Sequence, residues 1–122
     1  MALHVNIDKT RRLITASATG EISDADLEAM QSSFEANPEF SPTYSRICDL
    51  SGATAVTVTE SFLNRWAEDP MMERTARHAF VCTDPAVMSH VLEFVRQSRK
   101  HARDVSMFPT FDQAANWVKQ AT

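Results

Sequence analysis

Apolar and polar residues alternate near the start of the chain, which is the period of a half-buried β-strand. The alternation covers residues 3–8, and a second short run at 13–19 has the same strand character. A polar turn at 8–11 lies between them, so the pattern predicts a hairpin. In this interpretation Gly20 ends the second strand.

Apolar residues then recur at helical spacing in four later stretches, and each stretch follows a residue that can cap a helix. Ser23, Thr59 and Thr110 have side-chain oxygens that can accept hydrogen bonds from the first turn. Asp84 followed by Pro85 combines a capping carboxylate with a proline at the first helical position. The sequence therefore predicts four helices that begin at these positions.

Three apolar runs of strand length, at 44–50, 78–83 and 105–108, separate the predicted helices. The resulting order is β-β-α-β-α-β-α-β-α, which favours an α/β fold with a mostly parallel or mixed sheet and right-handed crossovers. The first strand is expected to join as an antiparallel edge. No repeat or linker divides the chain, so a single domain over 1–122 is predicted.

Composition narrows the class of protein. Hydrophobic residues make up 43% of the chain, charged residues 23%, and the net charge of −4 disfavours nucleic acid as a partner. No apolar run could span a bilayer, and the first residues do not form a secretory signal. Cys48 and Cys82 lie in apolar runs without a paired motif, as expected for reduced thiols in a cytoplasmic protein.

The run Asp49-Leu-Ser-Gly-Ala-Thr-Ala-Val56 provides the clearest family resemblance. Together with the order of elements, it resembles the anti-sigma-factor antagonist (STAS) fold, and in particular small, uncharacterised bacterial relatives of stage II sporulation protein AA. In that family a strand ends in an Asp-Leu-Ser-Gly-like stretch, and an Asp-Ser-Ser-Gly-Leu motif follows at the next helix start. The resemblance implies a STAS-like fold and a regulatory role without enzymatic activity.

The second motif departs from the family pattern. Thr57-Val-Thr-Glu-Ser61 stands where Asp-Ser-Ser-Gly-Leu is expected, so the family's aspartate and glycine are both missing. Thr59 falls at the position of the family's phosphorylated serine, but Glu60 beside it would repel an added phosphate. The residues around Thr59 therefore favour a role for its hydroxyl as a helix cap over a role as a phosphorylation site.

The candidate binding residues lie in two regions. The first is a loop expected between Asp49 and Thr59, which also contains Ser51 and Thr57 and should lie near the carboxyl ends of the parallel strands. The second comprises Trp66, expected in the core, with Met71 and Met72 as the lining of a pocket mouth or a homodimer contact.

Other chemistry has little support. His4, His78, His90 and His101 lack the spacing of metal ligands, and two glycines cannot build a phosphate-binding loop, so no metal and no cofactor are predicted. The leading hypothesis is a non-enzymatic module that binds a protein partner or a small apolar ligand. The alternatives are a carrier of a small lipid and a thiol-dependent enzyme using Cys82, whose place before a helix could activate it.

Overall fold

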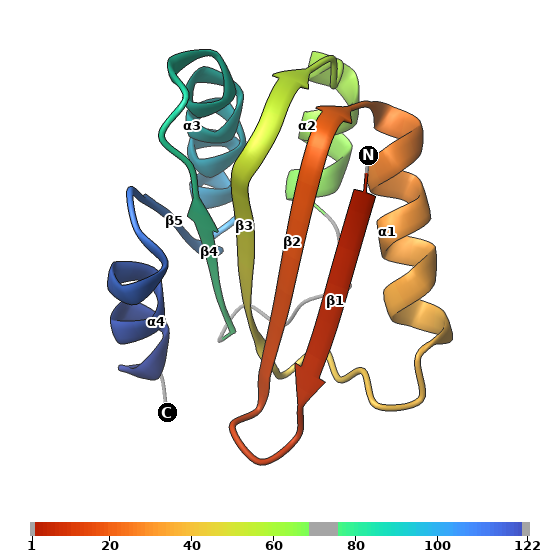
Figure 1. Cartoon of the computed structure of the whole chain (residues 1–122), viewed down its shortest axis with the longest axis vertical. Helices are drawn as coiled ribbons and strands as arrows, with labels where there is room; N and C mark the ends of the chain where they lie inside the picture. Colours follow the sequence, from red (N-terminus) through yellow and green to blue (C-terminus); the bar gives the residue numbers. More distant parts are fainter. Residues whose placement is uncertain (1, 69–75, 121–122) are drawn as a thin grey trace.

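The computed structural model describes residues 2–68 and 76–120, which form the five strands and four helices seen in Figure 1. In chain order these are β1 (Ala2–Asp8), β2 (Leu13–Ile22), α1 (Asp24–Ala36), β3 (Ser45–Val56), α2 (Glu60–Ala67), β4 (Arg77–Val81), α3 (Pro85–Lys100), β5 (Asp104–Phe108) and α4 (Phe111–Lys119).

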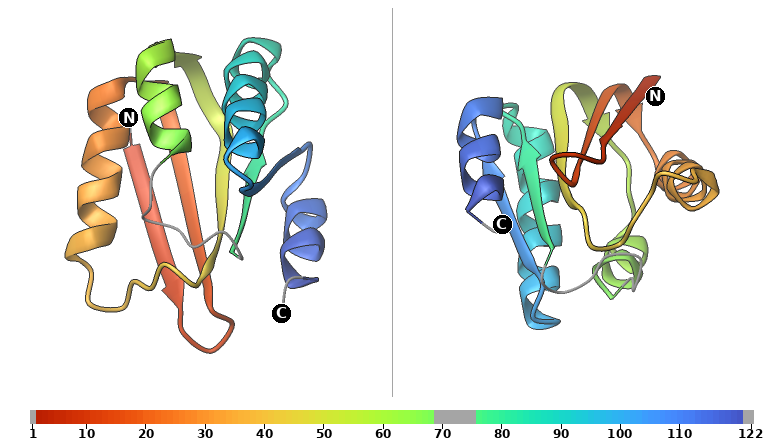
Figure 2. Two further views of the ribbon diagram at one scale, coloured as in Figure 1. Left: turned by 180° about the vertical axis from the view of Figure 1, so that it is seen from behind. Right: turned by 90° about the horizontal axis from the view of Figure 1, so that it is seen from below.

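The strands form one sheet in the order β1-β2-β3-β4-β5, in which β1 is antiparallel to β2 and every other pair is parallel. This confirms the predicted fold class and the antiparallel edge strand. Because the strand order never reverses, right-handed crossovers place α1, α2 and α3 on the same face of the sheet, and α4 covers the other face (Figure 2). Many α/β sheets bind ligands in a crevice that forms where the strand order reverses. Residues 2–68 and 76–120 form no such crevice, because their strand order does not reverse.

The main core lies between the sheet and α1–α3, and a smaller core lies beneath α4. Alternate residues of each strand contribute to the two cores because successive side chains point to opposite faces. Cys48 and Phe80 belong to the main core, whereas Ile47 and Ala79 pack under α4 with Val118.

The predicted ends of β2 and β3 are wrong, because these two strands stay paired beyond the glycines at which they were expected to end. Neither strand stops at its glycine: the two strands remain paired through Gly20 and Gly52 as far as Ile22 and Val56, with two shifts in register. Gly52 lies so close to β2 that a Cβ atom there would be 2.6 Å from Cγ2 of Thr19. This glycine permits close strand contact instead of breaking the strand, so residues 49–56 form strand where a loop was expected.

All four predicted helix starts are confirmed. Ser23 and Asp26 form a reciprocal capping box at α1, and the Thr59 hydroxyl accepts a hydrogen bond from the backbone of Phe62 at α2. The carboxylate of Asp84 accepts bonds from the first turn of α3, which begins at Pro85, and Thr110 caps α4.

Candidate functional site

The start of α2 projects from the edge of the sheet at which β2 and β3 end. Four exposed residues there, Thr57, Thr59, Glu60 and Ser61, are called the α2 rim below. The backbone amide and hydroxyl of Thr59 both donate to the carboxylate of Asp24, each over 2.8 Å. These two bonds join the start of α2 to the start of α1 and hold the rim in a defined conformation.

The surroundings of Thr59 disfavour phosphorylation. Its hydroxyl donates to Asp24 and accepts from the amide of Phe62, so both of its hydrogen-bonding roles are filled. A phosphate would also lie beside the Asp24 carboxylate and next to Glu60, where like charges repel. The geometry is that of a structural cap, in agreement with the interpretation drawn from the residues.

The other candidate residues of the 49–59 segment do not converge on one site. Thr57 donates from its amide and its hydroxyl to the carbonyl of Ile22, which ties the end of β3 to β2. Asp49 and Ser51 interact with each other: the Ser51 hydroxyl donates to Oδ1 of Asp49 over 2.6 Å. This pair lies on β3, with Asp49 at the same register level as Val81 of β4, well before the α2 rim.

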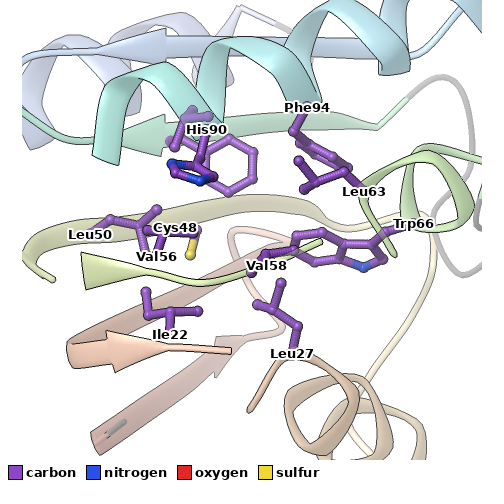
Figure 3. Close-up of a pocket in the computed structure, with 12 residues that line it drawn as sticks. Ile22, Leu27, Cys48, Leu50, Val56, Val58, Leu63, Trp66, His90 and Phe94 are labelled. Atoms are coloured by element: carbon purple, nitrogen blue, oxygen red, sulfur yellow. The ribbon is translucent and has the colours of Figure 1, made fainter. Parts of the chain in front are cut away.

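A small apolar pocket lies beneath the rim, between the sheet and helices α1, α2 and α3 (Figure 3). Trp66 is buried at its edge, with its ring 4.7 Å from that of Phe94. The free volume is about 40 Å³. Ligand pockets are typically about 300–1,000 Å³, so this space is too small for a lipid. The pocket lining comprises Ile22, Leu27, Cys48, Leu50, Val56, Val58, Leu63, Trp66, Phe80, His90, Val91 and Phe94.

A surface hollow between α2 and α3, called the α2–α3 hollow below, shares Val58, Leu63 and His90 with the pocket. Glu60 and Glu93 lie at its margin. Hydrogen bonds from Arg96 and Gln97 lower the pKa of Glu93 to about 2, so this carboxylate stays ionised at neutral pH. The hollow therefore has a mainly polar lining, in which the buried Val58 and Leu63 form its base and Glu93 is paired with Arg96.

The two thiols lie in unreactive environments. Cys82 is only 1% exposed, and burial raises its pKa, with the nearby charge of Asp84 acting in the same direction. Burial raises the pKa of Cys48 to about 12. Both thiols are therefore protonated at neutral pH, whereas nucleophilic attack requires the thiolate.

Met71 and Met72 lie outside the described residues, so the pocket mouth or homodimer contact assigned to them stays a prediction. Among residues 2–68 and 76–120, no three His, Cys, Asp or Glu side chains are grouped as metal ligands. Within the same residues, none of the helices has the length and apolar character needed to cross a membrane.

Comparison with known proteins identifies the fold. No protein-family model and no curated protein matches this chain. Among solved structures, an uncharacterized protein of the DUF3478 family with a SpoIIAA-like fold from Shewanella loihica is similar, with a TM-score of 0.62 and 13% identity over 95% of this chain and 93% of that one. This chain has a SpoIIAA-like fold. An anti-sigma factor antagonist from Mycobacterium paratuberculosis is similar to the same degree, with a TM-score of 0.62 and 16% identity over 97% of this chain and 95% of that one.

Sequence reasoning missed Asp24 as the partner of Thr59, because the two residues are 35 positions apart. It also missed the contribution of His90 to the pocket. The capping motif before α1 placed Asp24 at a helix start, but no sequence signal indicated that the starts of α1 and α2 meet. The two helix starts meet because α1 and α2 lie side by side on one face of the sheet.

Proposed function

We propose that this chain is a non-enzymatic regulatory module that binds a protein partner with the α2 rim and the adjoining α2–α3 hollow. The observation that carries the proposal is the fixed, exposed rim beside a surface hollow that has Val58 and Leu63 at its base. Interfaces of this kind gain affinity when an apolar anchor enters a recess, and a rigid surface loses less conformational entropy on binding. The similarity of fold to an anti-sigma factor antagonist supports a regulatory role by analogy.

Charge favours a basic partner surface. Residues 13–45 and 47–64, which include the α2 rim and α1, contain aspartate and glutamate but neither lysine nor arginine. Complementary charge speeds the encounter of two proteins and disfavours partners of the same sign. The partner is therefore expected to offer Lys or Arg side chains around one aliphatic or aromatic anchor.

Thr59 serves this function without phosphorylation. A partner that met the rim would contact a surface fixed by the Asp24–Thr59 hydrogen bonds, and no charge would have to be added or removed. Binding is thus expected to be insensitive to kinases and phosphatases that act on serine and threonine.

Site-specific photo-crosslinking tests the proposal. A benzophenone amino acid replaces Ser61 in the rim or, as a control, the exposed Glu35 on α1, and each variant is expressed in cells of the source organism. We expect one discrete protein adduct from position 61, none of that size from position 35, and loss of the adduct when Glu60→Lys is added. Identical adducts from both positions, or an adduct that survives Glu60→Lys unchanged, would contradict the proposal.

The lipid-carrier alternative has less support because the pocket beside Trp66 has only about 40 Å³ of free volume. Native mass spectrometry of gently purified protein separates the two functions. The regulatory module should show the mass of the bare chain, whereas a carrier should retain a ligand.

A further inference from the structure

Helix α4 covers only part of its face of the sheet. It packs against β3, β4 and β5, and none of the helices formed by residues 2–68 and 76–120 lies over β1 and β2 on this side (Figure 1). The uncovered part meets the first residue of α4, Phe111, in a groove with about 220 Å³ of free volume. This groove lies on the opposite face of the sheet from the pocket beside Trp66.

The strand register brings five polar side chains of the groove together. His4 on β1, Ser17 on β2 and Asp49 on β3 are successive cross-strand partners and form one row. Asn6 and Thr15 form the next row. Directly paired residues point to the same face of a sheet and lie about 5 Å apart, so these side chains form a compact array on a rigid floor.

Phe111 forms an apolar wall beside this floor. Its side chain is 41% exposed, and within residues 2–68 and 76–120 the only other large apolar residue that is so exposed is Leu92 on α3. The ring lines the same groove as Asp49 and the two hydroxyl residues. An aromatic face next to several hydrogen-bonding groups can bind a molecule that has both C–H and O–H surfaces.

Asp49 is the most strongly oriented polar group in the groove. The amide and hydroxyl of Ser51 both donate to its Oδ1 atom, over 3.0 Å and 2.6 Å. Within the described residues no hydrogen bond ends on Oδ2, so this oxygen can accept a bond from a ligand. The Asp49–Ser51 pair thus has a defined place in the groove although it takes no part in the α2 rim.

The lining also limits the class of ligand. Among the residues that the structure describes, neither lysine nor arginine lines the groove, and the carboxylate of Asp49 disfavours anions. Two hydroxyls, an amide, an imidazole and a carboxylate make a poor surface for a lipid, since their hydrogen bonds to water would be lost without replacement. Sugars fit both features, because their hydroxyl groups donate and accept while their C–H faces pack on aromatic rings.

We propose that this groove binds a neutral polyhydroxylated ring of about the size of one monosaccharide. The ring packs on Phe111, and its hydroxyl groups bond to Asp49, Ser17 and Asn6. The proposal is independent of the protein-binding role of the α2 rim, which lies at another part of the molecule.

Nuclear magnetic resonance tests this with the full, ¹⁵N-labelled chain and a panel of probes: glucose, galactose, mannose and ribose. We expect at least one sugar to give saturable shifts in the amides of residues 4–6, 15–17, 49 and 111. Phe111→Ala and Ser17→Ala should each weaken binding about tenfold, which corresponds to about 1.4 kcal/mol. The control Asn116→Ala, exposed on α4 outside the groove, should bind as the parent does.

The same spectra report whether each variant is folded, so loss of binding can be told from loss of structure. The absence of saturable shifts with all four sugars would overturn the proposal, as would shifts unaffected by Phe111→Ala and Ser17→Ala. Tetramethylammonium serves as an additional, cationic probe. If it shifts these amide signals and the sugars do not, the groove is a cation site and the proposal is wrong.

Discussion

His78 provides the sharpest test of how this core is built. The residue lies on β4 and is 5% exposed, and its ring is 4.4 Å from that of Phe80 and edge-on to Trp66. Its Nε2 atom has no hydrogen-bond partner within the described residues. Burial lowers the pKa of His78 well below its ordinary value of 6.5, and the charges of Arg46 and Arg103 lower it further.

The sign of the pH effect follows from this depressed pKa. The folded chain holds His78 neutral, whereas the unfolded chain takes up a proton as the pH falls through 6.5. Stability is therefore complete above that pH and is lost below it, at about 1.4 kcal/mol per pH unit until the folded pKa is reached. Between about pH 7.5 and about pH 5, His78 alone can remove up to about 2 kcal/mol from the free energy of unfolding, the limit set by protonation of the unfolded chain alone.

Urea unfolding, followed by circular dichroism at both pH values, measures this contribution. In His78→Phe the ring contacts are retained but the titrating group is removed. The free energy of unfolding of this variant should therefore fall less than that of the parent over the same pH range, by up to about 2 kcal/mol. His4→Gln is the matched control because it removes an exposed imidazole that lies outside the buried aromatic cluster. Equal pH dependence in the parent and in His78→Phe would refute the assignment of a buried, neutral imidazole.

Three further predictions use other parts of the structure. Thr59→Ala removes the hydroxyl that caps α2 and donates to Asp24 of α1, while the backbone amide of residue 59 can still donate to Asp24; the free energy of unfolding should fall by about 1–2 kcal/mol in urea titrations. An unchanged value would show that the hydroxyl bonds do not hold the rim. Gly52→Ala places a Cβ atom 2.6 Å from Cγ2 of Thr19 and should cost about 1–3 kcal/mol, much of which Thr19→Ala should restore in the double variant; equal losses in the single and double variants would contradict the close contact. Iodoacetamide should modify Cys48 and Cys82 far more slowly in the folded chain than in urea, because burial raises both pKa values; modification of Cys82 at the rate of a simple thiol would revive the enzyme hypothesis.

The order of elements and the helix starts could be predicted from the sequence because short-range interactions determine them. The Ser23 and Asp84 caps act on amides two or three residues away, and Pro85 sets its own backbone angle. The spacing of apolar residues similarly identified Trp66 as a core residue of α2, and it is buried. Each of these features depends on a few neighbouring residues.

The ends of the strands could not be predicted in the same way. Gly20 and Gly52 have the same local signature as turn glycines, but β2 and β3 support each other through both positions. Pairing between segments more than 30 residues apart decided that 49–56 is strand. Of the loop predicted over 49–59, only the few residues between β3 and α2 are loop in the structure.

By itself, the sequence determined an α/β chain with four capped helices, an antiparallel edge strand and two thiols in apolar runs. Only the tertiary structure decided that Asp24 holds Thr59, that His78 lies among aromatic rings and that His4, Ser17 and Asp49 share one row. The physical reason is range: caps and periodicity act within a few residues along the chain, whereas burial, strand register and contacts between helices depend on segments that only folding brings together.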